Sequence, residues 1–293
     1  MKTLLDEIID QTELDSNAKA GRASVGPESF EFEHDVPIRS GVADRELEVI
    51  GADTRKRVQT TTIAPFRYIC HVEINRGTGG EPGRTGTLIG PRTVLTAGHC
   101  IWDETNDRLE DLTTCVIRVI PGRNGSSEPL PATQAKKLIV PTGYNRSKGA
   151  TSLDYGIIQL KDDVGNRIGY WSMNYKKWPK DAYGVSILQR ALPQSVGQLK
   201  VNLCGYPTDR GGGIHQYLSY NSTQVLRDGM LHYLNDTGQG HSGSPVWVKR
   251  HPSMGGRVLV AIHVAGDDGT GKKANRAVFI NDTVRRFITT NTI

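Results

Sequence analysis

Three short motifs of this chain together contain the residue types of a Ser-His-Asp catalytic triad. They are TAGHC at residues 96–100, LDYG at residues 153–156 and GHSGSP at residues 240–245. A serine hydroxyl is a poor nucleophile at neutral pH, so a base has to take its proton while the oxygen attacks a carbonyl group. His99 would be that base, Asp154 would fix the imidazole tautomer, and Ser242 would be the nucleophile. The motifs therefore predict hydrolysis through a covalent acyl intermediate.

The glycines beside the serine predict an oxyanion hole. Gly240 and Gly243 allow the chain to turn sharply, which directs the N–H groups of Gly240 and Ser242 at the oxygen that becomes negative during attack. Loss of one such donor typically lowers the rate by about 10²–10³. Gly-x-Ser-Gly alone is a common turn pattern, so the prediction depends on the three motifs occurring together.

Short apolar runs next to each motif predict the strands that position these residues. VLT at 94–96 ends just before His99, GIIQL at 156–160 begins just after Asp154, and PVWV at 245–248 leaves the serine loop. The chain also has 33 glycines and only 6% aromatic residues. This composition is typical of many short strands joined by turns, and it predicts an all-β fold.

The order and context of the motifs resemble the chymotrypsin-like serine peptidases, in particular the bacterial glutamyl endopeptidases. The order His, Asp, Ser is that of chymotrypsin and differs from that of subtilisin and of the α/β-hydrolases. Further similar stretches are PGRNG at 121–125 and AVFIN at 277–281. The resemblance covers about residue 49 to the C-terminus, so it includes all three motifs.

This resemblance implies two chymotrypsin-like antiparallel β-barrels with the catalytic groups in the cleft between them. We expect the peptidase domain at 49–293, with a first barrel at about 58–165 and a second at about 180–280. A C-terminal helix at 281–290 is predicted from the residues themselves, because Asn281 is a favourable N-cap and apolar residues recur on one face of the following turns.

The resemblance also implies which residues form the primary substrate pocket. Thr237 matches a threonine that lines this pocket, and His263 matches the histidine that receives the substrate carboxylate. Hydrogen bonds from a histidine and a hydroxyl can bind a Glu side chain, so cleavage after Glu, or Asp, is expected. Asp236 falls where trypsin carries the carboxylate that selects Arg and Lys, but an Asp-Thr pair also occurs in some glutamyl endopeptidases. We therefore interpret Asp236 as outside the pocket or neutralised.

Two other functions stay open on the sequence alone. A trypsin-like (Arg/Lys) or broad-specificity peptidase would use the same triad with a different pocket. A catalytically silent binding module would keep the cleft but lose a triad member, and no member is missing here.

The N-terminal 48 residues differ in charge from the rest of the chain. Residues 1–48 carry 12 acidic and 5 basic residues, a net charge of −7, whereas residues 49–293 carry 31 basic and 19 acidic residues, a net charge of +12. An acidic leader on a basic body indicates a docked pro-segment or a solvated tail. The basic body would attract anionic peptides. A pI near 9.0 is also compatible with nucleic-acid binding, but no recognition motif accompanies it, so none is expected.

The junction after this leader predicts a zymogen. Glu48-Val49-Ile50-Gly51 resembles the mature start of glutamyl endopeptidases, whose freed amino terminus helps to bind the substrate carboxylate. We expect cleavage between Glu48 and Val49, by the enzyme itself or by an activating protease. His241 occupies the position of the trypsin Asp that pairs with the new terminus after activation. A histidine cannot supply that anion, so this switch is not expected here.

The sequence gives little information about the cellular compartment of the protein, and it predicts no cofactor. Acidic Asp6 and Glu7 interrupt any apolar run of a Sec signal, which leaves a cytoplasmic zymogen or another export route, although the resembled family is mostly secreted. No apolar stretch is long enough to span a membrane. The cysteines show no zinc spacing and the triad requires no metal. A Cys100–Cys115 disulfide and free buried thiols are both compatible with the sequence.

Overall fold

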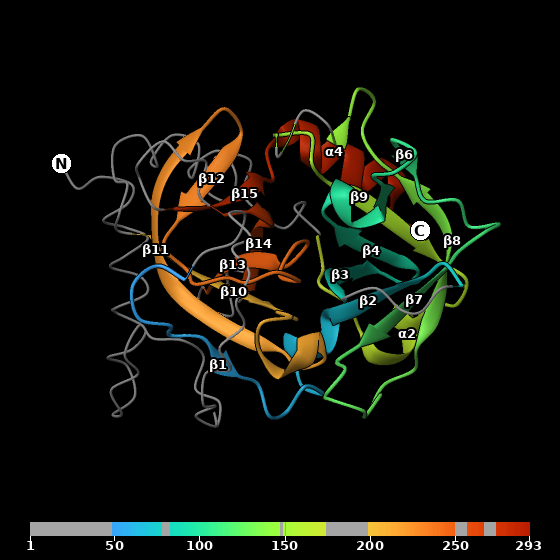
Figure 1. The fold of residues 1–293 in the computed structure, drawn as a ribbon, viewed down its shortest axis with the longest axis horizontal. Helices are drawn as coiled ribbons and strands as arrows, with labels where there is room; N and C mark the ends of the chain where they lie inside the picture. Colours follow the sequence, from blue (N-terminus) through green and yellow to red (C-terminus); the bar gives the residue numbers. More distant parts are fainter. Residues whose placement is uncertain are drawn as a thin grey trace.

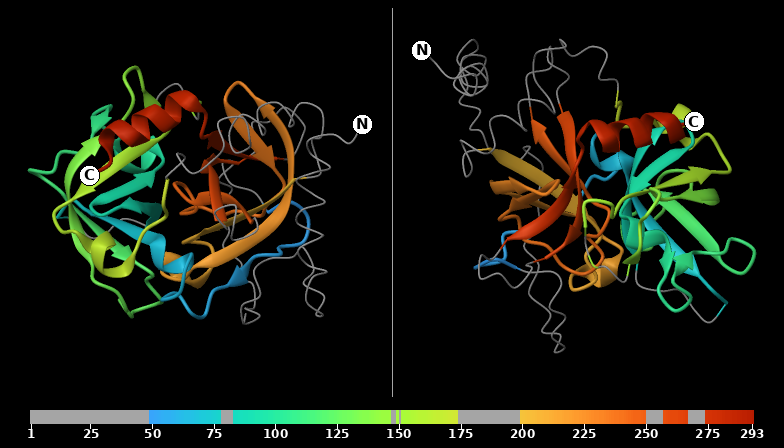
Figure 2. Two further views of the ribbon diagram at one scale, coloured as in Figure 1. Left: turned by 180° about the vertical axis from the view of Figure 1, so that it is seen from behind. Right: turned by 90° about the horizontal axis from the view of Figure 1, so that it is seen from above.

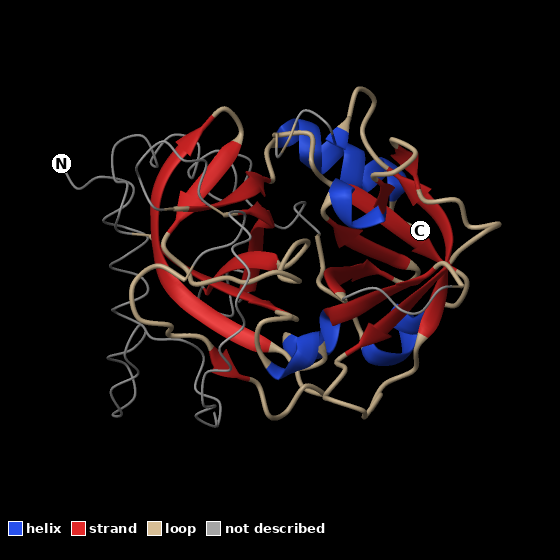
Figure 3. Ribbon diagram, in the orientation of Figure 1, coloured by secondary structure: helices blue, strands red, loops and turns tan. Residues whose placement is uncertain are grey.

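A computed structural model describes residues 49–77, 83–146, 149, 151–173, 199–249, 257–266 and 274–293. The predicted leader, including Glu48, lies outside these residues. The described chain forms two antiparallel β-barrels that lie side by side, as predicted (Figure 1). Strands dominate the structure and the helices are few and short (Figure 3). No helix among these residues is long and apolar enough to cross a membrane.

The first barrel is closed by six strands in the order β2-β3-β4-β9-β8-β7. Their bounds are β2 Ile69–Asn75, β3 Arg84–Gly90, β4 Thr93–Thr96, β7 Val116–Pro121, β8 Thr133–Ile139 and β9 Gly156–Leu160. A small hairpin of β5 (Trp102–Asp103) and β6 (Arg108–Leu109) and the one-turn helix α2 (Val164–Ile168) are attached to it. Apolar side chains such as Val72, Leu88 and Ile158 fill the interior and are inaccessible to solvent.

The second barrel has six strands and closes because β11 pairs with both β10 and β12. Their bounds are β10 Lys200–Gly205, β11 Tyr217–Arg227, β12 Met230–Tyr233, β13 Pro245–Lys249, β14 Arg257–Ala265 and β15 Asn275–Phe279. The two-residue strand β1 (Lys56–Arg57) pairs with β11 from outside this ring. Through β1, the start of the described chain is attached to the second barrel, although it leads directly into the first.

The two barrels share an apolar interface. Leu95 and Tyr155 of the first barrel belong to the same buried cluster as Trp247 and Ile262 of the second. Burial of such side chains is the dominant favourable term in folding, so this cluster fixes the barrels relative to each other. The segments that should hold the catalytic groups are therefore carried by two barrels that pack directly on each other.

The C-terminal helix α4 (Asp282–Asn291) joins the end of the second barrel to the first. The Asn281 side chain caps it by accepting hydrogen bonds from the N–H groups of Thr283 and Val284. Phe287 packs edge-on against Tyr155, with ring centroids 5.0 Å apart. Figure 2 shows the helix lying along the first barrel. The predicted C-terminal helix is present, and it ties the two barrels together.

Candidate active site

His99 and Asp154 meet because of strand pairing within the first barrel. His99 lies in the 3₁₀ turn Gly98–Ile101, just after β4, and Asp154 lies just before β9. Strands β4 and β9 are antiparallel neighbours with Thr96 opposite Gly156, so the end of one strand is next to the beginning of the other. His99 Nδ1 is 2.8 Å from Asp154 Oδ2, and the backbone N–H of His99 donates to Asp154 Oδ1 at 2.9 Å. The carboxylate thus fixes the imidazole both through its ring and through its backbone.

The two side chains change each other's protonation. Burial alone would lower the pKa of His99, but the Asp154 carboxylate outweighs burial and raises this pKa above the usual 6.5. Burial alone would raise the pKa of Asp154, but the charge and hydrogen bonds of His99 lower it below 3.8. Opposite charges at hydrogen-bond distance have this effect because each stabilises the ionised form of the other. The pair is therefore suited to stabilise an imidazolium when His99 accepts a proton.

The loop around Ser242 in the second barrel, here called the serine loop (residues 240–244), packs directly on the first barrel. The Thr85 N–H donates to the Ser242 carbonyl at 3.0 Å, and the Thr85 hydroxyl donates to the Gly240 carbonyl at 2.7 Å. A Cβ atom at Gly243 would lie 2.0 Å from the Thr85 carbonyl oxygen and 3.1 Å from the Ala97 nitrogen. Only glycine allows this approach, and its φ of +85° also favours glycine. The contact places Ser242 beside the segment that carries His99.

The hydrogen bonds of the described chain do not include one between the Ser242 hydroxyl and His99. Such catalytic bonds are often long without substrate and shorten in the reacting complex. The structure thus joins His99 to Asp154 directly, and it places Ser242 next to them through the backbone of its loop.

The turn before the serine leaves two N–H groups available. Gly240 has φ of +94°, and a Cβ atom there would lie 2.2 Å from the Tyr206 carbonyl oxygen. Within the described part of the chain, neither the Gly240 N–H nor the Ser242 N–H donates a hydrogen bond, whereas the next N–H, of Gly243, donates to His263 O at 2.8 Å. Two unsatisfied donors on either side of one residue are the arrangement that an oxyanion hole requires.

Two predicted pocket residues are buried with unused polar atoms. Thr237 is 1% exposed, and its hydroxyl has no hydrogen-bond partner among the described residues. His263, in β14, is fully buried, and its Nε2 likewise has no partner in the described part of the chain. Its Nδ1 lies 2.5 Å from the Tyr233 hydroxyl, a contact that the sequence did not indicate. Burial, followed by the nearby His241, lowers the pKa of His263 well below 6.5, so its ring is neutral.

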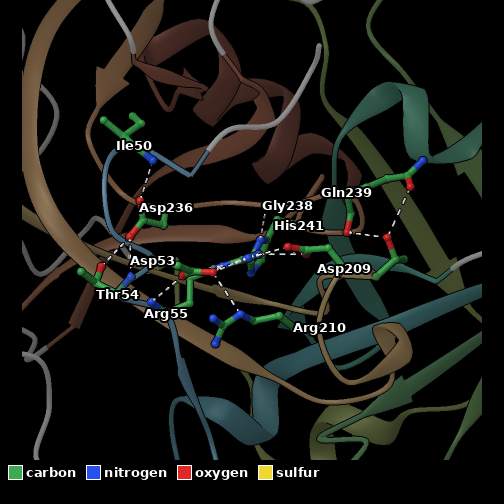
Figure 4. A network of polar contacts seen from close by, with 11 residues as sticks. Ile50, Asp53, Thr54, Arg55, Asp209, Arg210, Asp236, Gly238, Gln239 and His241 are labelled. Atoms are coloured by element: carbon green, nitrogen blue, oxygen red, sulfur yellow. Dashed lines mark hydrogen bonds and ion pairs between the residues drawn. The ribbon is translucent and has the colours of Figure 1, made fainter. Parts of the chain in front are cut away.

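Asp236, next to Thr237, turns its carboxylate toward the beginning of the described chain. It is 1% exposed and accepts hydrogen bonds from Ile50 N and Thr54 N, both at 2.8 Å, and from the Thr54 hydroxyl at 2.6 Å (Figure 4). The carboxylate is thereby satisfied by neutral donors. Val49 directly precedes the anchored Ile50 and is half-buried.

An ionic cluster around the buried Arg55 side chain lies behind the serine loop and was not predicted from the sequence. The Arg55 guanidinium, 1% exposed, contacts the carboxylates of Asp53 and Asp209, with its Nη2 2.7 Å from Asp53 and 2.5 Å from Asp209. Arg210 adds a 3.0 Å contact to Asp53. Burial alone would lower the pKa of Arg55, but the two carboxylates raise it, so the side chain stays charged. No motif or periodicity marks such residues, because the cluster joins segments that are far apart in the chain.

His241 is part of the loop's internal structure. It is fully buried, and its Nδ1 accepts a hydrogen bond from the Gly238 N–H at 2.9 Å. Burial, followed by the charge of Arg55, lowers its pKa to about 3. The residue is therefore neutral and supplies no anion for a new amino terminus.

The four cysteines are buried and none of them is in a disulfide, so the Cys100–Cys115 disulfide that the sequence left open is not formed. Within the described residues, no group of three or more His, Cys, Asp or Glu side chains is placed to hold a metal ion.

Comparisons with known proteins agree with this architecture. The Trypsin family model matches residues 57–288. The chain is 32% identical over 277 residues to the glutamyl endopeptidase of Bacillus licheniformis, covering 94% of this chain and 78% of the relative. It is 32% identical over 239 residues to a Bacillus subtilis protein named extracellular metalloprotease, covering 80% of this chain and 68% of that protein.

Among solved structures, a Glu endopeptidase in complex with MPD matches with a TM-score of 0.63 and 26% identity, over 83% of this chain and 98% of that one. The family match and the identity over nearly the whole chain lead to one assignment. The chain belongs to the trypsin family and is a serine endopeptidase of the glutamyl endopeptidase-like kind.

Proposed function

We propose that Ser242 is the nucleophile, His99 the general base and Asp154 the group that orients it. The observation that carries this proposal is the doubly bonded His99–Asp154 pair beside a serine loop that packs on the same segment. Ser242 Oγ attacks the scissile carbonyl carbon while His99 Nε2 takes its proton. The carbonyl π electrons move to the oxygen, which the Gly240 and Ser242 N–H groups stabilise.

Collapse of this intermediate breaks the C–N bond, and His99 gives its proton to the leaving amine. Water, deprotonated by His99, then attacks the acyl-enzyme and releases Ser242. Throughout, Asp154 stays ionised and stabilises the imidazolium, which agrees with its lowered pKa. Peptide bonds are thus cut without a cofactor in any of these steps.

The substrate side chain next to the cut is proposed to be Glu, or Asp, bound by Thr237 and His263. Each of these side chains has a buried polar atom without a partner, which is unusual and costly unless a ligand satisfies it. If the Tyr233 hydroxyl donates to His263 Nδ1, the neutral ring carries its proton on Nε2 and offers it to a carboxylate. The name of the Bacillus licheniformis relative, a glutamyl endopeptidase, supports the same substrate.

Processing between Glu48 and Val49, by the enzyme itself or by an activating protease, is part of the proposal. The new amino group of Val49 would add a positive charge near the substrate carboxylate. Support comes from the placement of the next residue, because Ile50 is hydrogen-bonded to Asp236, which adjoins Thr237. Sequencing the amino terminus of active material tests this step, and fully active enzyme that still begins at Met1 would contradict it.

The alternative of trypsin-like specificity for Arg and Lys is less well supported. It requires the Asp236 carboxylate to face the substrate, but both of its oxygens accept hydrogen bonds from Ile50 and Thr54. A silent binding module is also less well supported, since the His99–Asp154 pair and the two free N–H groups are preserved.

Chromogenic peptides that differ only at the residue before the cut separate these functions. We expect kcat/KM to be at least about tenfold higher for Glu than for Gln, Arg or Phe, since a lost charge-assisted hydrogen bond changes binding by at least that factor. A preference for Arg would favour the trypsin-like alternative. No cleavage of any peptide by processed enzyme would favour the binding module.

A further inference from the structure

The segment at residues 50–55, here called the leading segment, touches the beginning and the middle of the loop that carries the serine. This loop, residues 236–242, is called the nucleophile loop. We propose that Asp236 and Arg55 are positioning residues that hold the leading segment and the nucleophile loop together in the reactive arrangement. The inference rests on the proposed role of Ser242, but it concerns residues to which the mechanism gives no part.

Asp236 forms the first contact between the two segments. All three of its hydrogen bonds come from the leading segment, two from backbone N–H groups and one from the Thr54 hydroxyl. Among the described residues, no cation pairs with this carboxylate. A buried carboxylate without partners is strongly disfavoured, so Asp236 keeps its inward position only while the leading segment is docked on it.

Arg55 forms the second contact, five residues further along the leading segment than Ile50, whose N–H is the first that is anchored. Its guanidinium is fixed in a fork between Asp53 of its own segment and Asp209, which follows β10. The backbone of Gly238 lies directly on this ion pair, because a Cβ atom there would lie 2.1 Å from Asp209 Oδ1 and 2.5 Å from Arg55 Nη1. Figure 4 shows this packing of the ion cluster against Gly238 and His241.

Besides these two contacts and the hydrogen bonds that Thr208 and Thr85 donate to Gln239 and Gly240, the nucleophile loop has an internal support. His241 Nδ1 accepts from the Gly238 N–H, and the His241 N–H donates to the Gly238 carbonyl at 3.0 Å. These bonds shape the turn but do not attach it to the barrel. Asp236 attaches one end of the turn, and the Arg55–Asp209 pair supports its middle, just before the oxyanion-hole residue Gly240. Loss of this support should therefore misplace the donors of the oxyanion hole for every substrate.

A different role for Asp236 predicts a different result. If its carboxylate lined the substrate pocket, removing its charge would change the preference between substrates with acidic, neutral and basic side chains. A positioning role lowers kcat by a similar factor for all of them, because the oxyanion forms in every case.

The experiment compares Asp236→Asn, Thr54→Val and Thr54→Ser with the full wild-type chain as processed in the same preparation. For Asp236→Asn we expect a roughly 10- to 100-fold fall in kcat on peptides with Glu, Gln or Phe before the cut, from the loss of charge-assisted hydrogen bonds. Thr54→Val should lower kcat by about 3- to 10-fold, since it removes one donor. Thr54→Ser keeps that donor and should retain nearly wild-type kcat. Asp228→Asn is the matched control, because its carboxylate is 90% exposed.

Hydrogen exchange of peptides that cover residues 50–55 gives a readout that does not need activity. We expect slow exchange in the wild type and faster exchange in Asp236→Asn and Thr54→Val, with Thr54→Ser unchanged. If Asp236→Asn does not fold, the comparison of Thr54→Val with Thr54→Ser still tests the proposal.

Wild-type kcat in Asp236→Asn or Thr54→Val, a changed substrate preference without a fall in kcat, or a Thr54→Ser variant as slow as Thr54→Val would each overturn the proposal. No turnover by the wild type would instead contradict the role of Ser242. In that case exchange in the variants would still report whether the leading segment is anchored.

Discussion

The two halves of the proposed catalytic machinery are positioned in different ways. His99 and Asp154 follow from the pairing of two neighbouring strands in one barrel, so local register alone brings them together. The nucleophile loop has no such strand partner, and it is held by Thr85 of the other barrel and by the leading segment. The position of the proposed base therefore depends on one barrel, whereas that of the proposed nucleophile depends on contacts between distant segments. Substitution of His99 or Asp154 should lower the rate of the chemical step directly. Substitutions around the nucleophile loop should lower that rate indirectly, by displacing Ser242 or by destabilising the fold.

The largest effect on kcat is expected for the His99–Asp154 pair, which strand pairing brings together. Asp154→Asn keeps the size of the side chain but removes the charge and favours the wrong imidazole tautomer, so kcat should fall by about 10⁴. Steady-state kinetics on a Glu peptide measure this effect. Asp163→Asn, near the start of α2, is the control and should be indistinguishable from the wild type. A loss smaller than about tenfold in Asp154→Asn would separate Asp154 from the mechanism.

Substitutions beside Ser242 should lower the free energy of unfolding more than substitutions at comparable positions elsewhere. Gly243→Ala forces a Cβ atom to within 2.0 Å of the Thr85 carbonyl at a φ of +85°. Backbone strain and overpacking together should lower the free energy of unfolding by about 2–6 kcal/mol. Gly143 has a similar φ of +83° with no atom near its missing Cβ, so Gly143→Ala should lose only about 1 kcal/mol. Denaturant unfolding measures both, and equal losses would show that the serine loop is not tightly packed on the first barrel.

A substrate-specific effect is expected at the pocket. Thr237→Val removes a hydroxyl that has no partner in the free protein, so the free energy of unfolding should not fall. The same change should lower kcat/KM for a Glu peptide by about 10- to 100-fold and leave a Phe peptide nearly unaffected. Thr289→Val, on the exposed side of α4, is the matched control. Equal losses on both peptides would remove Thr237 from the recognition of the carboxylate.

The smallest expected effect is a shift in the pH at the midpoint of the rise in kcat/KM. His99 has to be neutral to accept the serine proton, so kcat/KM should rise with pH through the His99 pKa. Because Asp154 raises this pKa, the midpoint should lie above 6.5 in the wild type. In Asp154→Asn the carboxylate charge is gone, and the midpoint of the residual activity should move to lower pH. A midpoint that is the same in both proteins would contradict the coupling of the two side chains.

The difference between the His99–Asp154 pair and the nucleophile loop also explains which features could be predicted from the sequence. The runs at 94–96, 156–160 and 245–248 are strands in the structure, as β4, β9 and β13, and each motif lies at the strand end where it was expected. A short continuous apolar run carries this information within a few positions. The N-cap role of Asn281 was predicted for the same reason, since helix capping depends on neighbouring residues.

The support of the nucleophile loop left no such local signal. Asp236 is separated from Thr54 by 182 positions, and two of its three partners are backbone N–H groups, which every residue except proline has. Arg55 and Asp209 are ordinary charged residues whose pairing, and the burial of Arg55, follow only from the complete fold. His263 was predicted as a pocket residue by resemblance, but its Tyr233 partner is in β12, which is separated from β14 by β15, and no local pattern in the sequence indicates this contact.

Covalent labelling tests most directly that Ser242 is a nucleophile activated by the His99–Asp154 pair. Processed wild-type enzyme is treated with a fluorophosphonate, and the modified peptide is identified by mass spectrometry. We predict one adduct, on Ser242, that forms in step with the loss of peptidase activity and forms far more slowly in Asp154→Asn. An adduct on another residue, or full loss of activity without modification of Ser242, would contradict the account.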